Sequence, residues 1–310
     1  MVKIVNKNWI LSNLKLSLQT SSSVSSTVKS IIKDVKENGD KAVLKYVKKF
    51  ENSKATIKNI KLSKQDLKRA YDSISKKDKE ALKLAYQRIH YYHTKQRKTS
   101  YSYKDQLDTK FHIQWNPIDN VGLYIPGGMA SYPSTVLMTS IPAKIANVPN
   151  VMLCVPSKNG NTSNLTLAAA YLCDVDYVYN IGGAQAIAAF AHGTKIIKKA
   201  DKVFGPGNQF VAEAKKQLFG TIGIDLPAGP SEILVICNQK SNPNWIAYDV
   251  LAQAEHDPHA KTYVVSSSKS LLERVKKEIS SLVKISKIQN IEQSVKNHCF
   301  LIQAKGKKEI

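Results

Sequence analysis

From residue 121 onward, short apolar segments alternate with glycine-rich turns and helical segments, and this pattern constrains the fold more than any other feature. Four or five apolar residues bounded by turn residues predict a buried strand, and apolar residues every three or four positions predict a helix. Strands and helices in alternation form open, mostly parallel sheets with flanking helices, so the fold class is α/β. The expected strands are 121–125, 151–155, 177–180, 202–204 and 233–237, and the expected helices are 135–146, 164–172, 185–191 and 209–218.

The first hundred residues predict a helical segment. Apolar residues recur at helical spacing over 25–37, where Gly39 can end the helix and Asp40 can cap the next one. Capping boxes of Ser and Asp are predicted over 63–66 and 75–78. Near residue 100 the period changes to two, which predicts strands with one solvated face. The alternating residues are Tyr101, Tyr103, Phe111, Ile113 and Trp115.

Composition places the chain among globular proteins. Its 310 residues are 43% hydrophobic, enough to bury one large core or two smaller ones. No apolar run approaches the ~18 residues of a membrane span, and the N-terminus lacks the apolar segment of a signal peptide. The four cysteines lie far apart, and Cys154 and Cys237 occur in strand-like segments. We therefore expect buried free thiols and a cytoplasmic location.

A formal net charge of +22 raises the question of a nucleic-acid partner. The lysines are spread over the outer faces of the N-terminal helices and over the C-terminal third, without an aromatic-interleaved groove motif. Solubility is a sufficient explanation for such charge. A non-catalytic module that binds a nucleotide or a polyanion remains the alternative function.

Four of the expected strands adjoin turns rich in glycine or proline. At the carboxyl ends of parallel strands, glycine lets backbone amides approach a ligand, and a helix N-terminus favours an anion such as pyrophosphate. None of these turns is Gly-x-Gly-x-x-Gly, the standard dinucleotide fingerprint. One such turn is ordinary turn chemistry, but four together predict a polar cleft along one sheet edge. The turns are 124–128, 181–185, 204–208 and 227–232.

Gln253 and His256 stand at the end of another expected helix, which starts near Asn244. At this spacing both side chains could leave one helical face and reach one metal ion. A closed zinc site requires four donors, and this pair offers two. On spacing alone, a polar helix end with a hydrogen-bonded histidine is the more frequent structure. His259, three residues further on, is interpreted as a solvent-exposed loop residue.

Five motifs occur in order along the chain. They are Val-Gly-Leu-Tyr-Ile-Pro-Gly-Gly at 121–128, Gly-Gly-Ala-Gln-Ala-Ile-Ala-Ala at 182–189, Phe-Gly-Pro-Gly-Asn at 204–208, Pro-Ala-Gly-Pro-Ser-Glu at 227–232 and Gln-Ala-Glu-His at 253–256. Together they resemble the histidinol dehydrogenase family, and the resemblance covers nearly the whole chain. It implies a homodimeric enzyme that uses NAD and zinc to oxidise L-histidinol through the aldehyde to L-histidine, the last two steps of histidine biosynthesis.

The resemblance also implies roles for six residues and an arrangement of domains. The NAD contacts would be Tyr124, Gln185 and Asn208, and the substrate contacts Ser231, Gln253 and His256, of which the last two would also bind zinc. Two Rossmann-like domains are expected. Residues 1–118 would form a helical segment and the first part of a discontinuous α/β domain, 119–228 an inserted NAD-binding domain, and 229–310 the continuation of the first domain.

The chain departs from the family pattern near its last residue, Ile310. The family's acid/base pair, adjacent Glu and His, would follow the strand expected at 300–302, and two further zinc ligands, Asp and His, would follow later. The 310 residues contain no match for these groups. We therefore expect no catalytic acid/base residue in this chain, and a fragment rather than a protein with a new role. Alone it is expected to be inactive, because two protein ligands give little of a four-donor site's affinity.

Overall fold

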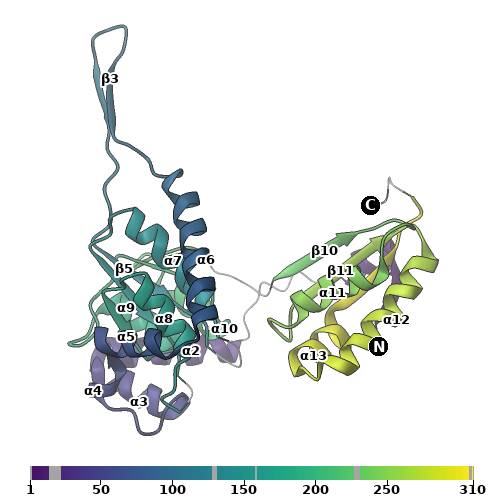
Figure 1. The fold of residues 1–310 in the computed structure, drawn as a ribbon, viewed down its shortest axis with the longest axis horizontal. Helices are drawn as coiled ribbons and strands as arrows, with labels where there is room; N and C mark the ends of the chain where they lie inside the picture. The colour runs from purple at the N-terminus through teal and green to yellow at the C-terminus, as the bar shows by residue number, and fades with distance from the viewer. Residues whose placement is uncertain are drawn as a thin grey trace. The chain divides into compact units, whose positions relative to one another are not determined.

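The computed structural model describes residues 2–13, 22–127, 131–157, 159–226, 231–306 and 309. By its internal contacts the chain divides into two units (Figure 1). Unit 1 contains residues 1–19 and 228–310, and unit 2 contains residues 20–227. Unit 1 is therefore discontinuous in sequence, and unit 2 is inserted into it.

The domain boundaries differ in part from those expected. The boundary after residue 227 lies next to the one expected after residue 228. The other boundary follows residue 19, whereas the sequence predicts it after residue 118. Packing explains the difference: α2 (Ser22–Asn38) contacts α9 (Gly183–His192) and α10 (Gln209–Leu218), which both belong to unit 2. A helical pattern shows that a segment has an apolar face, but not which sheet that face covers.

Unit 2 is built on a six-stranded sheet in the order β2-β7-β6-β5-β8-β9. Five adjacent strands are parallel, and β2 pairs antiparallel with β7 at the edge. From β5 the chain adds β6 and β7 on one side, and then β8 and β9 on the other side of β5. The direction of strand addition therefore reverses between β5 and β8, which makes this place the topological switch point. The strands are β2 (Lys61–Leu62), β5 (Asn120–Tyr124), β6 (Asn150–Cys154), β7 (Tyr177–Tyr179), β8 (Lys202–Phe204) and β9 (Gly223–Ile224).

Helices cover both faces of this sheet, and the alternation of side chains along its strands separates two cores. In β6, Met152 and Cys154 belong to one cluster of buried side chains, whereas Val151 and Leu153 belong to the other. The predicted open, mostly parallel α/β fold is confirmed. The first core is covered by α2, α3 (Asp40–Phe50), α9 and α10, and the second by α5 (Lys64–Ser73), α6 (Lys76–Thr94), α7 (Pro133–Ile145) and α8 (Asn164–Leu172); α4 (Ile57–Ile60) precedes β2.

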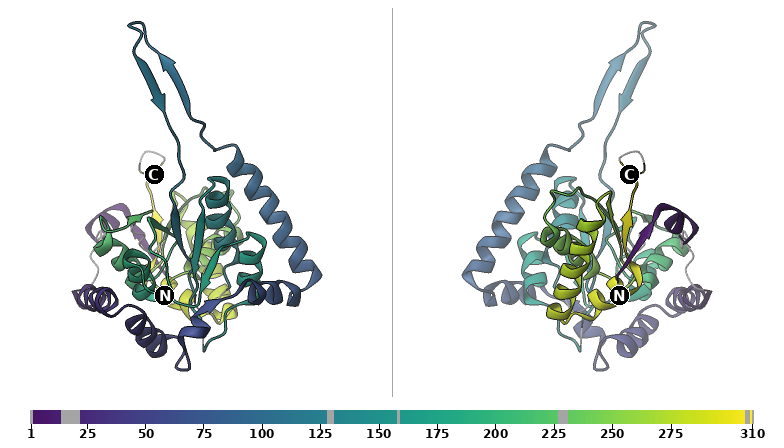
Figure 2. Two further views of the ribbon diagram at one scale, coloured as in Figure 1. Left: turned by 90° about the vertical axis from the view of Figure 1, so that its left-hand side faces the viewer. Right: turned by 90° about the vertical axis from the view of Figure 1, so that its right-hand side faces the viewer.

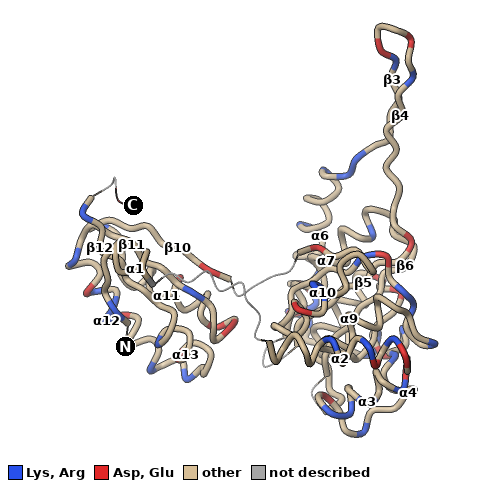
Figure 3. The backbone as a smooth tube through the Cα atoms, turned by 180° about the vertical axis from the view of Figure 1, so that it is seen from behind, with Lys and Arg blue, Asp and Glu red and all other residues tan. Residues whose placement is uncertain are grey.

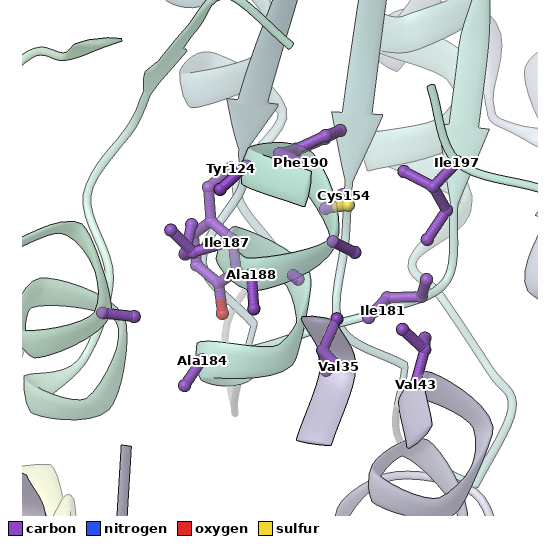
Figure 4. Close-up of a cluster of buried hydrophobic side chains, with 14 of the residues drawn as sticks. Val35, Val43, Tyr124, Cys154, Ile181, Ala184, Ile187, Ala188, Phe190 and Ile197 are labelled. Carbon is purple, nitrogen blue, oxygen red and sulfur yellow. The ribbon is translucent and has the colours of Figure 1, made fainter. Parts of the chain in front are cut away.

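Helix α9 is the most deeply buried helix of the first core (Figure 4). Every residue from 184 to 191 is buried, as a helix that is apolar on all sides requires. Phe190 lies against Gly122 of β5, where an added Cβ would be 2.7 Å from the phenyl ring. The glycine therefore gives the ring the space it occupies over the central strand.

The cap predicted at Asp40 is wrong. Gly39, with a φ of 51°, is the N-cap residue of α3, and Asp40 is the first residue of the helix. The Asp40 side chain instead accepts a hydrogen bond from the Ile196 backbone N–H at 3.4 Å. The capping box at Ser63 is confirmed, since the side chains of Ser63 and Asp66 each accept a hydrogen bond from the other's backbone N–H.

Strands β3 (Tyr101–Lys104) and β4 (Lys110–Ile113) form an antiparallel hairpin that extends beyond the end of α6 (Figure 2). The sequence predicts one solvated face, but all eight strand residues are exposed. Tyr103 and Phe111 stack across the hairpin with ring centroids 5.1 Å apart, so the alternation here supports cross-strand pairing. Trp115 follows β4 and is also exposed.

Unit 1 has a four-stranded, wholly parallel sheet in the order β1-β12-β11-β10. Its strands are β1 (Lys3–Asn6), β10 (Glu232–Ile236), β11 (Lys261–Ser266) and β12 (Cys299–Gln303). One core contains residues of α11 (Pro243–Ala254), α12 (Lys269–Ser286) and α13 (Gln289–His298), and a smaller one contains Ile10 of α1 (Lys7–Asn13). The sequence pattern does not predict β1 or α13.

Lysine and arginine residues are scattered along helices and loops of both units rather than gathered on one element (Figure 3). In the described ranges, no helix is both long enough and apolar enough to cross a membrane. All four cysteines are buried and free, which confirms the burial expected for Cys154 and Cys237.

Phe190→Ala tests the packing of α9. The ring is fully buried, so we expect its loss to lower the free energy of unfolding by about 3–5 kcal/mol. Phe219→Ala is the control, because Phe219 is 71% exposed and its loss should change stability by less than about 0.5 kcal/mol. Urea unfolding followed by circular dichroism measures both variants. Equal effects of the two substitutions would contradict the packing described here.

Candidate functional site

The turns that follow β5, β6, β7 and β8 are packed together at the carboxyl edge of the unit 2 sheet. A Cβ on Gly127 would lie 2.5 Å from Pro156, and a Cβ on Gly182 would lie 2.6 Å from the same ring. A Cβ on Gly205, whose φ is 114°, would lie 2.0 Å from the carbonyl oxygen of Tyr124. Glycine is required at these positions because the turns approach one another more closely than a side chain permits.

Three of the four predicted turns, 124–128, 181–185 and 204–208, lie at this edge. The fourth joins β9 of unit 2 to β10 of unit 1. Its residues 227–230 lie outside the described residues, as does Gly128 of the first turn.

Tyr124, the last residue of β5, joins that strand to the start of α9. Its side chain is buried, and its hydroxyl oxygen accepts a hydrogen bond from the Gly183 backbone N–H at 3.0 Å. Burial raises the pKa of Tyr124 above its usual value, so the phenol is neutral across the physiological range. The buried Tyr124 side chain therefore holds the turn after β7 in place through this hydrogen bond.

Gln185 and Glu51 meet below the same turn. Gln185, in the first turn of α9, is buried, and its side-chain Nε2 donates to Glu51 Oε1 at 3.2 Å. Glu51 directly follows α3 and is absent from the sequence-based site. The sequence does contain an indication of its role. A carboxylate at the C-terminal end of a helix interacts unfavourably with the helix dipole, which suggests that Glu51 stands there for a reason other than ending α3.

Asn208 lies on the β5–β8 side of the edge, at the switch point. It is exposed, and its side-chain oxygen caps α10 by accepting from the backbone N–H groups of Phe210 at 3.1 Å and Val211 at 3.2 Å. Gly207 precedes it, and a Cβ there would lie 2.4 Å from Val211. The chain between β8 and α10 is thus held tightly at the place where open α/β sheets bind ligands.

An ion pair between a buried lysine and a partly buried aspartate fixes the turn at Gly205. Lys215 of α10 donates to the Gly205 carbonyl oxygen and to Asp225 Oδ1, the latter at 2.7 Å. The other oxygen of Asp225 accepts from the Gly205 N–H at 2.9 Å. Neither charged residue is among those predicted from the sequence. The spacing offers a signal for Lys215, which stands four residues after Val211 and three before Leu218, on the buried face of the helix.

The three residues predicted to contact substrate lie in unit 1. Ser231 is exposed just before β10, and its carbonyl oxygen accepts from the Lys261 N–H at 3.3 Å. Gln253 is half-buried in the last turn of α11, which ends at Ala254, and His256 is exposed beyond that end. The helix therefore stops short of His256, contrary to the single helical face expected. The two residues are instead linked through the His256 N–H and the Gln253 carbonyl oxygen, 3.4 Å apart.

The donors available to a metal in unit 1 are limited. Over the part of the chain that the structure describes, no three His, Cys, Asp or Glu residues are grouped so as to hold a metal ion. His256 offers an imidazole nitrogen, a common zinc ligand, and Gln253 offers an amide oxygen, an uncommon one. Of the four donors of a closed zinc site, this segment therefore has two to offer.

A sequence model of the histidinol dehydrogenase family matches residues 14–310. The chain belongs to the histidinol dehydrogenase family. It is 46% identical over 266 residues to the histidinol dehydrogenase of Hydrogenovibrio crunogenus and covers 61% of that protein. It is 42% identical over 298 residues to that of Nitrosomonas europaea and covers 69%. These alignments span 86% and 96% of the present chain.

The fold agrees with a solved structure of the same family. The crystal structure of histidinol dehydrogenase from Elizabethkingia anophelis superposes with a TM-score of 0.86 at 32% identity, over 99% of this chain and 71% of that one. The chain is thus shorter than the histidinol dehydrogenases that it matches, spanning 61% and 65% of the first two curated relatives. These relatives are named histidinol dehydrogenase, and the chain resembles this enzyme family over most of its length.

Lys215→Met tests the ion pair that fixes the Gly205 turn. The substitution leaves the Gly205 carbonyl and Asp225 without their buried cation, so we expect a loss of about 3–5 kcal/mol in the free energy of unfolding. Lys216→Met removes the same charge from the neighbouring exposed position and should change stability by less than about 0.5 kcal/mol. Chemical denaturation measures both variants, and comparable stability of the two would refute a structural role for the pair.

Proposed function

We propose that this chain carries out NAD binding and substrate positioning for the NAD-dependent, zinc-using oxidation of L-histidinol through the aldehyde to L-histidine. One observation supports this most directly. Tyr124, Gln185 and Asn208, far apart in a chain of the histidinol dehydrogenase family, all lie at the carboxyl ends of parallel strands on one sheet. Asn208 stands at the switch point of that sheet, where dinucleotides bind in open α/β folds.

The three residues would serve NAD in two ways. Asn208 is exposed and would contact NAD directly at the start of α10, where backbone N–H groups favour phosphate. Tyr124 and Gln185 are buried, and they would define the shape of the NAD site by supporting the turn that includes Gly183. Contacts of Tyr124, Gln185 and Asn208 with NAD itself are part of the same proposal.

Ser231, Gln253 and His256 would form the substrate side of the site. Gln253 and His256 would supply two zinc ligands, and the Ser231 hydroxyl would donate or accept a hydrogen bond with L-histidinol. When bound, NAD supplies the hydride acceptor, and zinc supplies a Lewis acid and a template for the substrate. Assembly as a homodimer in the cytoplasm is part of the same proposal.

For the 310 residues alone we propose NAD binding without turnover. Proton removal from the alcohol requires a general base, and the family's Glu-His pair has no match in these residues. Oxidation of histidinol by the isolated 310-residue chain, supplied with zinc and NAD, would refute this part of the proposal.

Gly205→Ala tests the NAD site. Its Cβ would collide with the Tyr124 carbonyl at a φ of 114°, so the turn must move, and we expect NAD affinity to fall by about tenfold or more. Gly220→Ala is the control: its φ is also positive, at 94°, but an added Cβ has no atom within 4 Å. Calorimetric titration with NAD should show affinity within about twofold of the unmodified chain for this control.

The same titration separates the enzyme from the alternative function. If the unmodified chain fails to bind NAD but is retained on a polyanion resin in a strongly salt-dependent manner, the +22 charge would indicate a polyanion-binding module instead.

His256→Ala tests the metal half-site. Loss of an outer partner of a metal ligand typically weakens affinity about 10- to 100-fold, so loss of a ligand itself should cost at least about tenfold. His259→Ala removes the other imidazole of the same loop and should leave zinc affinity unchanged. Competition with a chromophoric chelator measures both variants. Equal losses would show that zinc is held non-specifically by the loop.

A further inference from the structure

Glu51 lies beneath the turn that begins α9, although it comes from a different part of the chain. It is the residue that follows α3, and it is half-buried. Its Oε1 accepts from the Gly182 backbone N–H at 2.9 Å and from Gln185 Nε2 at 3.2 Å, and its Oε2 accepts from the Ser157 N–H at 3.2 Å. One carboxylate thus ties together the turns after β6 and β7.

Burying the Glu51 carboxylate at this position costs free energy, because a charged group loses its hydration. Burial raises the pKa of Glu51, and the hydrogen bonds from Gly182, Ser157 and Gln185 oppose that rise. In the described part of the chain, no Lys, Arg or His side chain forms an ion pair with it. A negative charge at the C-terminal end of α3 is also unfavourable to the helix dipole. Ending α3 therefore gives no reason for an acid at this position.

The carboxylate supplies the cap that α9 lacks. Gly182 is the N-cap residue of α9 and has no side chain to accept from the first backbone N–H groups. Glu51 accepts from the Gly182 N–H, and the Tyr124 hydroxyl accepts from the Gly183 N–H. Two side chains from distant segments thus replace the missing local cap, while the glycines leave the outer side of the turn open to a close approach.

We propose that Glu51 is a positioning residue of the NAD site: its carboxylate holds the Gly182–Gln185 turn and the Gln185 amide in the conformation that receives NAD. The inference rests on the function proposed above and assigns no contact between Glu51 and NAD. Its action is transmitted through Gly182 and Gln185. Both oxygens of Glu51 serve only as acceptors, so an amide in its place would direct an N–H group at one of the three donors.

Glu51→Gln tests the proposal, with calorimetric titration of NAD into the full 310-residue chain. We expect NAD affinity to fall by about tenfold or more, because the amide cannot accept from all three donors. Glu37→Gln is the matched control: Glu37 lies on α2 in the same unit, its side chain is 58% exposed, and its ion pair with Lys33 is 4.0 Å long. The control should bind NAD within about twofold of the unmodified chain.

Two further measurements separate positioning from general stability. Hydrogen exchange of the Gly182 and Gly183 amides should accelerate in Glu51→Gln more than exchange in the strands of the sheet, which a global loss of stability would not produce. Glu51→Asp keeps the charge on a shorter side chain and should bind NAD with intermediate affinity. If Glu51→Gln fails to fold, Glu51→Asp decides the matter, and unchanged NAD affinity in that variant overturns the proposal.

The outcomes distinguish this inference from the function on which it rests. If the unmodified chain does not bind NAD, the proposed function fails, and the role of Glu51 fails with it. If the unmodified chain binds NAD and Glu51→Gln binds equally well, only the role of Glu51 is overturned.

Discussion

The burial of α9 is the interaction on which the rest of unit 2 depends. This helix is apolar on all sides, and it lies between the central strands and α2, so neither the sheet nor the N-terminal helices can form their core without it. Phe190 reaches over β5 only because Gly122 has no side chain. The same helix begins at the turn where the proposed NAD site lies. Packing of an apolar helix thus fixes the position of a polar site.

The turns of that site are held by charged groups that sit behind them. Lys215 and Asp225 bond both polar groups of Gly205, and Glu51 bonds the Gly182 N–H and the Gln185 amide. Glycine turns allow a ligand to approach closely but have little conformational preference of their own. Buried hydrogen bonds supply the missing rigidity, at the cost of desolvating the charges. The glycines and the charged anchors are therefore two parts of one arrangement.

The proposed NAD site could be predicted only in part from the sequence. Tyr124, Gln185 and Asn208 were reachable from motifs, because each motif is local and the five occur in order. Glu51 and Lys215 were not predicted, because neither residue lies within those motifs. Their hydrogen-bond partners, Gly182 and Gly205, are 131 and 10 residues away in the chain. The end of α11 before His256 was also missed, since a polar turn continues the helical spacing for a few residues without being helix.

The sequence by itself determined the α/β class, most strands and helices of the two sheets, and the family, because period, turn residues and motif order are local properties of the chain. Tertiary structure decided where the chain divides, since N-terminal helices with ordinary apolar faces could have covered either sheet. It also decided that the aromatic hairpin is solvated on both sides and that the fourth glycine turn leads into the other unit. These outcomes depend on which surfaces meet, and hydrophobic burial is non-directional, so a sequence pattern does not name its partner.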